Sequence, residues 1–402
     1  MEHRVDRREF LAGVAGAAII LPRSRPPAIR FAVIGLNHAH INSMTAAVLR
    51  GGGELVSVFA KEPDLAAAFI KRYPQATLAR SEQEILESDV QAVLSAAIPD
   101  ERAPLGIRVM QHGKDYLSDK PGITSLEQLA EVRRVQAQTR RIYSICYSER
   151  HEVRAAVKAG DLVQAGAIGR VVQTVNLAPH RISLNTRPEW FWHKPRYGGI
   201  LCDIGSHQAD QFLFYTGSTR ADVVSSQVGN VKHKDKPEFE DFGDMVLRGD
   251  GGTGYVRLDW FTPDGLSTWG DGRLTILGTE GYIELRKYVD IAGRPGGDHL
   301  FLVDQKQTRY MDCKDVELPF GPRFVSDVVN RTETAMPQAH TFLATELVLK
   351  AQKQAQTLDL REIRLDLTLK HGLGLPGVAR LLALADAEDR LEPGVERRGD
   401  LA

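Results

Sequence analysis

Short apolar runs alternate with amphipathic stretches over residues 29–147 of the chain. The runs have the length of buried strands, and the stretches between them space their apolar residues three and four apart, as helices do. The predicted strands cover residues 29–34, 55–59, 92–97, 116–117 and 142–147, and the predicted helices cover residues 39–49, 64–72, 103–112 and 126–138. This alternation predicts an α/β fold with a doubly wound parallel sheet over residues 28–148.

The pattern changes after about residue 150, where strand-like runs follow one another across glycine-rich turns. The predicted strands cover residues 171–177, 223–231, 242–247, 254–261, 274–277 and 282–285, with turns at 249–252 and 278–281 and helices at 324–330 and 341–355. Strands joined directly by tight turns make an antiparallel meander. We therefore predict a second, α+β domain with an open, mainly antiparallel sheet over residues 149–356, followed by an unassigned extension, residues 357–402.

Residues 1–27 differ from both domains. A basic head with Arg7 and Arg8 precedes a run of small and apolar residues at 11–21, which is shorter than the roughly twenty residues that cross a bilayer. The paired arginines before Phe10 and Leu11 resemble a twin-arginine export signal, with an amphipathic extension as the alternative. We expect the export machinery for such signals to carry the folded protein to the periplasm, and the cleavage position stays open.

Composition narrows the classes of partner. The 402 residues carry 51 basic and 52 acidic side chains, so bulk charge does not point to nucleic acid or to an anionic membrane. Three cysteines, Cys146, Cys202 and Cys313, are too few and too scattered for a disulfide framework or a thiolate zinc site. We expect small molecules and further copies of the chain as partners, and no nucleic acid.

The first predicted strand runs into a glycine-poor version of a nucleotide-binding loop. Residues 35–40 stand where a dinucleotide-binding protein carries G-x-G-x-x-G, and Gly35 alone keeps its glycine. Asn37 can adopt the left-handed conformation at modest cost, and the helix N-terminus still offers N–H groups to phosphate. His38 and His40 are candidate donors to a cofactor, with local packing in the first helical turn as the alternative.

The end of the second predicted strand bears on the choice of cofactor. An acidic side chain there would hold the ribose hydroxyls, but the position is Ala60. Lys61 beside it is a candidate partner for a 2′-phosphate, which weakly favours NADP, whereas Glu62 is a candidate for the ribose. Pro99 completes the set of candidate cofactor-binding residues.

The segment at residues 198–210 holds the most informative polar residues of the second half. Asp203, His207 and Asp210 are spaced four and three apart, which places them on one face of a helix. An imidazole flanked by carboxylates suits proton transfer. The alternative is an acidic first helical turn with an incidental histidine.

Residues 180–196 are rich in aromatic rings and in hydrogen-bond donors, which suit a polyhydroxylated ligand. His180, Arg187 and Trp192, together with Asp210, are the candidate substrate-binding residues. The segment would form a lid over a pocket or, alternatively, anchor a long loop or a subunit contact. No short histidine–carboxylate motif of a known zinc type is present, so we predict no metal.

Three motifs in order resemble those of the glucose-fructose oxidoreductase and inositol dehydrogenase family, Gfo/Idh/MocA. Asp119-Lys120-Pro121-Gly122 resembles the Glu-Lys-Pro motif of that family, with Asp in place of Glu. Residues 198–207 resemble the segment that contributes its catalytic aspartate and histidine, and residues 278–281 resemble its Gly-Thr-x-Gly turn. The resemblance covers roughly residues 29–355.

The resemblance implies a Rossmann-type nucleotide domain that binds NAD or NADP, and a hydride transfer at a hydroxyl carbon of a sugar, cyclitol or related polyol. It places Lys120 beside the nicotinamide and makes Asp203 and His207 catalytic. A positioned base and a positive charge near the developing alkoxide suit that chemistry. Because free nicotinamide cofactors are scarce outside the cytoplasm, we expect the cofactor to be tightly bound.

Two other functions remain open. An NAD-dependent glycoside-cleaving enzyme would use the same residues for a transient oxidation, and a carbohydrate-binding homologue without cofactor is motivated by Asn37, His40 and Ala60. The open sheet of the second domain needs a cover for its exposed face, so we expect a homodimer or a homotetramer.

Overall fold

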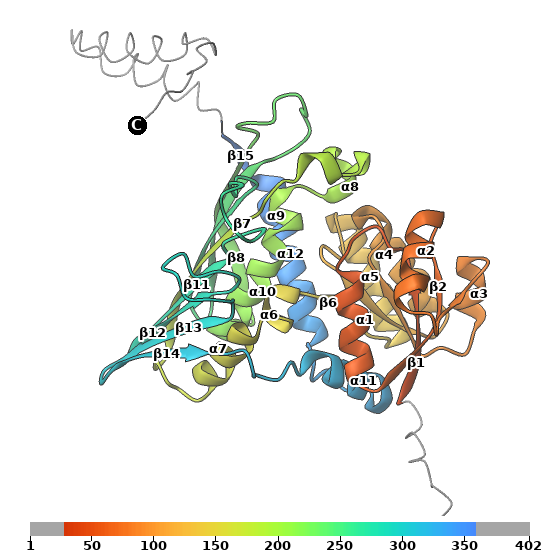
Figure 1. The fold of residues 1–402 in the computed structure, drawn as a ribbon, viewed down its shortest axis with the longest axis horizontal. Helices are drawn as coiled ribbons and strands as arrows, with labels where there is room; N and C mark the ends of the chain where they lie inside the picture. The colour runs from red at the N-terminus through yellow and green to blue at the C-terminus, as the bar shows by residue number, and fades with distance from the viewer. Residues whose placement is uncertain (1–27, 359–402) are drawn as a thin grey trace, which may run out of the picture. The chain divides into compact units, whose positions relative to one another are not determined.

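The computed structural model describes residues 28–358, and Figure 1 shows their arrangement. The first domain is a six-stranded sheet in the order β3-β2-β1-β4-β5-β6, and all of its strand pairs are parallel. Its strands are β1 (Ile29–Ile34), β2 (Gly53–Phe59), β3 (Thr77–Leu78), β4 (Ala92–Ser95), β5 (Asp115–Asp119) and β6 (Tyr143–Cys146). The predicted doubly wound sheet is therefore confirmed.

Helices connect these strands, and the apolar face of each packs on the sheet. They are α1 (Ile41–Arg50), α2 (Pro63–Arg72), α3 (Glu82–Glu87), α4 (Pro99–Gln111) and α5 (Leu126–Thr139). The sequence pattern predicted four of them and missed α3, which is short and strongly acidic. It also missed β3, because two exposed residues leave no apolar run.

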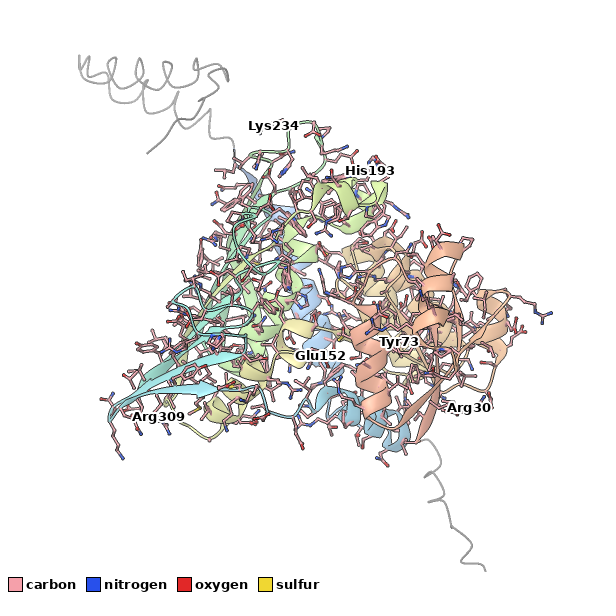
Figure 2. The ribbon with its side chains drawn as sticks, in the orientation of Figure 1. Arg30, Tyr73, Glu152, His193, Lys234 and Arg309 are labelled. Carbon is pink, nitrogen blue, oxygen red and sulfur yellow. The ribbon has the colours of Figure 1, made fainter. Side chains whose placement is uncertain are left out.

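The second domain is built on a nine-stranded sheet in the order β14-β13-β12-β11-β7-β10-β9-β8-β15. Its strands are β7 (Val171–Pro179), β8 (Ala221–Gly229), β9 (Phe242–Gly249), β10 (Thr253–Asp259), β11 (Arg273–Gly278), β12 (Gly281–Arg286), β13 (His299–Asp304), β14 (Thr308–Asp312) and β15 (Gln356–Thr357). The sheet is mainly antiparallel, as predicted, but β7 runs parallel to β10 and β15 runs parallel to β8. Figure 2 shows Arg309 of the unpredicted β14 at one end of this sheet.

Helices cover the inner face of the second sheet and connect it to the first domain (Figure 1). They are α6 (Ser148–His151), α7 (Arg154–Gln164), α8 (Lys194–Tyr197), α9 (Ile200–Asp203), α10 (Gly205–Thr216), α11 (Phe320–Asn330) and α12 (Gln338–Gln354), with 3-10 turns η1 (Leu184–Thr186) and η2 (Glu189–Trp192). Alternate residues of the strands, such as Met245 and Leu258, are buried against α9, α10 and α12. Helix α11 packs on α1 of the first domain, so the second half of the chain contacts both domains.

Two predicted regions fall outside the described residues: the signal-like segment 1–27 and the extension from residue 359 onward. Within residues 28–358, none of the helices combines the length and the apolar character needed to cross a membrane. The three cysteines are buried free thiols, in agreement with the sequence analysis.

Candidate active site

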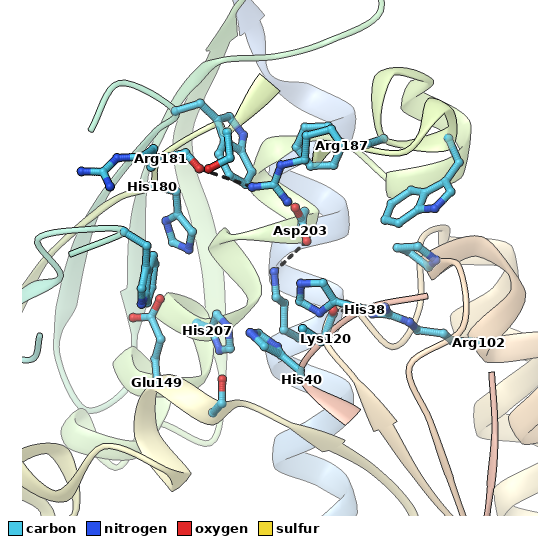
Figure 3. Close-up of a pocket in the computed structure, with 18 of the residues that line it drawn as sticks. His38, His40, Arg102, Lys120, Glu149, His180, Arg181, Arg187, Asp203 and His207 are labelled. Carbon is cyan, nitrogen blue, oxygen red and sulfur yellow. Dashed lines mark hydrogen bonds and ion pairs between the residues drawn. The ribbon is translucent and has the colours of Figure 1, made fainter. Parts of the chain in front are cut away.

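A cavity of about 300 Å³ lies between the two domains, beside the carboxyl ends of the parallel strands. In open α/β sheets, ligands bind at this edge. The residues that line the cavity are His38, Ala39, His40, Pro99, Arg102, Lys120, Ser148, Glu149, His180, Arg181, Ser183, Arg187, Trp190, Phe191, Asp203, His207, Trp260, Trp269 and Tyr288. Figure 3 shows that the three predicted catalytic residues face this one space.

Lys120 and Asp203 join the two domains inside the cavity. Lys120 follows β5, Asp203 ends α9, and the lysine Nζ lies 2.9 Å from the carboxylate Oδ1. Burial raises the pKa of Asp203, but the charge and the hydrogen bond of Lys120 outweigh it and hold that pKa below the ordinary value. The pair is therefore an ammonium and a carboxylate that face the ligand space together.

His207 lies one helical turn beyond Asp203, on α10. The residue is 2% exposed, and its Nδ1 has no hydrogen-bond partner among the described residues. Burial, with a smaller contribution from the charge of Lys120, lowers the pKa of His207 to about 3. The imidazole is therefore neutral near pH 7 and can accept a proton.

This burial predicts a pH-dependent stability. Because the folded pKa of His207 is about 3 and the ordinary value is 6.5, the unfolded chain takes up a proton first as the pH falls. Stability is therefore lost between about pH 6.5 and pH 3, and His207 accounts for about 2–3 kcal/mol of that loss at pH 4.5. Urea unfolding at pH 7 and pH 4.5 should show a smaller loss for His207→Gln, whereas the exposed His112→Gln should keep the wild-type loss; equal losses in all three proteins would contradict this.

The start of α9 is fixed by contacts that orient Asp203. Gly199 has a φ of +90°, and a Cβ there would lie 2.3 Å from the Gln352 carboxamide, so glycine is required. The backbone N–H of Ile200 donates to Glu240, and that of Leu201 donates to Gln352. Gly199 therefore permits the close approach of this segment to α12.

His38 and His40 face the cavity and share one carboxylate. The Nδ1 atoms of His38 and His40 lie 2.6 Å and 3.0 Å from the oxygens of Asp119, which also accepts from the Lys120 backbone and pairs with the buried Arg102. Burial raises the pKa of Asp119, but its interactions with His40, Arg102 and His38 outweigh it and hold that pKa well below the ordinary value. The side chains of His38, His40 and Asp119 are close enough to share a metal ion. The hydrogen bonds of Asp119 account for their arrangement without one.

The nucleotide loop keeps a fold suited to a dinucleotide. Gly35 has a φ of +84° and contacts Ala97 so closely that a Cβ would lie 2.6 Å from the Ala97 Cβ. Asn37 does not adopt the left-handed conformation that the sequence analysis allowed; its amide donates instead to Glu62. A small adjoining cavity, lined by Gly35, Asn37, Ala60 and Glu62 among others, continues this site past the end of β2.

Lys61 lines this second cavity but is already paired. Its Nζ lies 2.9 Å from Glu101, and its side chain is 70% exposed. The predicted 2′-phosphate partner is therefore engaged by a carboxylate, whereas Glu62 bonds only an amide. Pro99 begins α4 and lines the main cavity.

Two of the four predicted substrate-binding residues line the cavity, and two do not. His180 and Arg187 face it from β7's end and the following loop (Figure 3). Burial lowers the pKa of His180 to about 4, so it is neutral near pH 7. Arg187 lies over the rings of Phe191 and Trp260, 4.4 Å and 4.8 Å from their centroids.

Trp192, predicted to bind substrate, does not line the cavity. It is buried and packs its ring against Phe191 and Phe239, in the aromatic cluster that anchors the loop. Trp190, two residues earlier, lines the cavity instead. The segment therefore combines both functions that the sequence analysis left open, since one side faces the ligand space and the other packs in the core.

Asp210, also predicted to bind substrate, does not line the cavity either. Its carboxylate is fully buried, receives two hydrogen bonds of 2.6 Å and 2.7 Å from Arg150, and pairs with His340. Arg150 comes from α6 and His340 from α12, so Asp210 ties three helices together away from the cavity. Its physical function is structural.

The sequence analysis missed Glu149 and Arg102, which line the cavity. Glu149 is buried and forms an ion pair of 2.7 Å with Lys287 of the second domain. Arg102 is buried on α4 and donates to the backbone carbonyl of Ala97 and pairs with Asp119. A charged residue can be identified as part of a buried site only once its partner is known. The partners of Glu149 and Arg102 are distant in the sequence.

Comparison with known proteins gives two family matches. Residues 29–147 match the model described as "Oxidoreductase family, NAD-binding Rossmann fold", and residues 156–284 match the model of the GFO/IDH/MocA C-terminal domain. No curated protein matches the chain.

Solved structures give similar results. A candidate oxidoreductase from Erwinia carotovora atroseptica SCRI1043 is 49% identical over 82% of this chain and 100% of its own, with a TM-score of 0.80. KijD10, a 3-ketoreductase from Actinomadura kijaniata in complex with NADP and TDP-benzene, is 17% identical over 83% of this chain and 99% of its own, with a TM-score of 0.66. A candidate NADPH-dependent oxidoreductase from Desulfitobacterium hafniense DCB-2 is 20% identical over 82% of this chain and 96% of its own, with a TM-score of 0.68. The last two likenesses show the fold alone.

Proposed function

Because the chain belongs to the Gfo/Idh/MocA family of NAD-binding oxidoreductases, we propose that it transfers a hydride between NAD and a hydroxyl carbon of a sugar, cyclitol or related polyol. One observation carries this proposal. The ammonium of Lys120 from the nucleotide domain meets the carboxylate of Asp203 in a cavity that also holds the neutral imidazole of His207.

The three side chains divide the proton chemistry between them. NAD, when bound, supplies the hydride acceptor. The neutral imidazole of His207 accepts the proton of the substrate hydroxyl, and the ammonium of Lys120 stabilises the negative charge that develops on that oxygen. Asp203 holds the Lys120 Nζ in place, 2.9 Å from its carboxylate. The aromatic side chains of Trp190, Phe191 and Trp260 restrict water around these groups.

We propose that Gly35, Asn37, His38, His40 and Pro99 hold the dinucleotide, with the pyrophosphate at the N-terminus of α1. The close Gly35–Ala97 contact and the cavity beside Glu62 support this. Two basic side chains, Lys61 and Arg108, lie beside Glu62, and each is paired with a carboxylate. Because neither is free to bind the 2′-phosphate of NADP, we favour NAD. Tight binding would keep the cofactor in an exported enzyme.

The test is direct. Mass spectrometry of the small molecules released on denaturation should find NAD, and a neutral polyol should reduce the bound NAD, seen as NADH absorbance. Release of a glycosidic leaving group without net reduction would favour the transient-oxidation reaction instead. Failure to bind either dinucleotide in calorimetry would contradict both reactions and favour a binding protein.

We propose a homodimer or homotetramer formed through the outer face of the nine-stranded sheet. In the described part of the chain no helix covers this face, and Leu277 and Tyr282 lie opposite each other on it, 42% and 40% exposed. Tyr282→Glu should place a charge in the interface and yield a monomer in light scattering. Leu78→Glu, at an exposed position of the nucleotide domain, should keep the wild-type mass; a monomeric wild type would contradict the proposal.

We propose that the twin-arginine-like segment exports the folded enzyme to the periplasm. The support is the arginine pair before an apolar run too short for an anchor. Replacing Arg7 and Arg8 together by lysine should move the protein from the periplasmic to the cytoplasmic fraction, whereas Arg4→Lys should not. Equal fractionation of the three proteins would contradict export by this route.

A further inference from the structure

Glu149 lines the cavity from the N-terminal end of α6, on the opposite side from Arg102 in Figure 3. Its two carboxylate oxygens differ. Oε2 accepts hydrogen bonds from the Lys287 Nζ at 2.7 Å and from the Gln208 Nε2 at 3.0 Å. Oε1 accepts none from any residue in the described range. One oxygen is therefore held by the protein and the other is left to the cavity.

The surrounding contacts fix this orientation. The Lys287 side chain is fully buried, and its Nζ also donates to Gln211 at 2.8 Å. Burial raises the pKa of Glu149, but the charge of Lys287 outweighs it and holds that pKa far below the ordinary value. The carboxylate is thus ionised and can only accept hydrogen bonds.

No residue in the described range donates a hydrogen bond to Oε1. His180 and His207, which face the same space, are neutral near pH 7 and so bring no positive charge to it. The cations Lys120 and Arg187 face the ligand space around Asp203 (Figure 3). A ligand group that reaches Oε1 must therefore bring its own donor, and an anionic substituent there would meet the negative charge of the Glu149 carboxylate.

We propose that Glu149 is a specificity-determining residue whose Oε1 binds a hydroxyl or amino group of the substrate and excludes a carboxylate or phosphate from that position. The inference rests on the proposed function, since it assumes that the polyol substrate occupies this cavity. It also narrows that function to substrates that are neutral or amino-substituted at the end that reaches α6.

Glu149→Gln tests the proposal because the surrounding donors dictate how the amide must lie. Lys287 and Gln208 both donate, so the amide oxygen takes the place of Oε2 and the NH₂ group takes the place of Oε1. The substitution thus turns an acceptor into a donor at one point of the cavity. Glu152→Gln is the matched control: Glu152 is the next carboxylate of the segment, pairs with Arg50 and does not line the cavity (Figure 2).

The probes are D-glucose, myo-inositol, D-glucosamine, D-glucose 6-phosphate and D-glucuronate, titrated into the NAD-loaded protein by calorimetry and assayed for NAD reduction. We expect the wild type to favour neutral or amino members. Relative to Glu152→Gln, Glu149→Gln should weaken the binding of a hydroxyl ligand about tenfold and that of an ammonium ligand about 100-fold. It should also improve the binding of the anionic probes relative to the neutral ones. The affinity for NADH should not change.

Equal affinities of Glu149→Gln and Glu152→Gln for every probe would overturn the inference, and so would a wild type that binds only the anionic members or none. Binding that depends on Glu149 without NAD reduction would instead contradict the proposed function alone. If Glu149→Gln fails to fold because Lys287 loses its counter-charge, the double variant Glu149→Gln, Lys287→Met removes both charges and should show the same shift in preference.

Discussion

Lys120→Met should lower kcat for NAD reduction by about 1000-fold while leaving the affinity for NADH within a few fold of the wild type. The substitution keeps the length and the apolar stem of the side chain and removes the only ammonium group that the described residues place within 2.9 Å of Asp203. The alkoxide then develops without a neighbouring positive charge, and Asp203 loses the partner that lowers its pKa.

Lys114→Met separates this effect from the loss of a buried lysine as such. Lys114 is 6% exposed, as Lys120 is, and lies just before β5, but its Nζ donates to the carbonyls of Ser88 and Val90, away from the cavity. This variant should keep wild-type kcat. Single-turnover absorbance of NADH and fluorescence titration of the dinucleotide give the two quantities; a Lys120→Met protein with kcat within tenfold of the wild type would contradict the assigned function of Lys120.

The local patterns predicted what depends on neighbours in the sequence. The run of β1 is apolar over the length of a strand, and Asp203 and His207, which the sequence spaces four apart, both line the cavity. Asp210 shares that spacing, yet it faces away from the cavity because Arg150 and His340 reach it from two other helices. Helical periodicity gives a face but does not say which neighbour covers it.

The pair of Glu149 and Lys287 shows what the sequence could not reveal. The two charges are 138 positions apart and meet only after β12 and α6 come together across the second domain. Each alone resembles an ordinary surface charge, since Lys and Glu are rarely buried without a partner. The same reasoning explains Arg102, whose helix position is unremarkable until Asp119 is seen beside it. Long-range pairing of charges is thus the part of the site that needs the tertiary structure.

Gly35→Ala should abolish tight dinucleotide binding, raising the Kd for NADH at least about 100-fold. The alanine Cβ would lie 2.6 Å from the Ala97 Cβ and 2.9 Å from its Cα, so either the loop before α1 or the segment after β4 must move. The left-handed φ of +84° adds roughly 1–2 kcal/mol of strain for a non-glycine residue, and overpacking adds about 1–3 kcal/mol. Both segments border the proposed pyrophosphate site, so relief of the clash disturbs it directly.

Gly52→Ala isolates the steric part of this effect. Gly52 has nearly the same φ, +86°, but the nearest heavy atom to its added Cβ is the Ala28 Cβ at 4.0 Å. The two variants share the conformational strain, and only Gly35→Ala adds the contact with Ala97. Thermal unfolding should therefore show a modest loss for Gly52→Ala with an unchanged Kd for NADH, and a larger loss with weak binding for Gly35→Ala. If the two variants bound NADH equally well, the close packing of Gly35 would not be what shapes the cofactor loop, and His38, His40 and the α1 N-terminus would have to hold the dinucleotide without it.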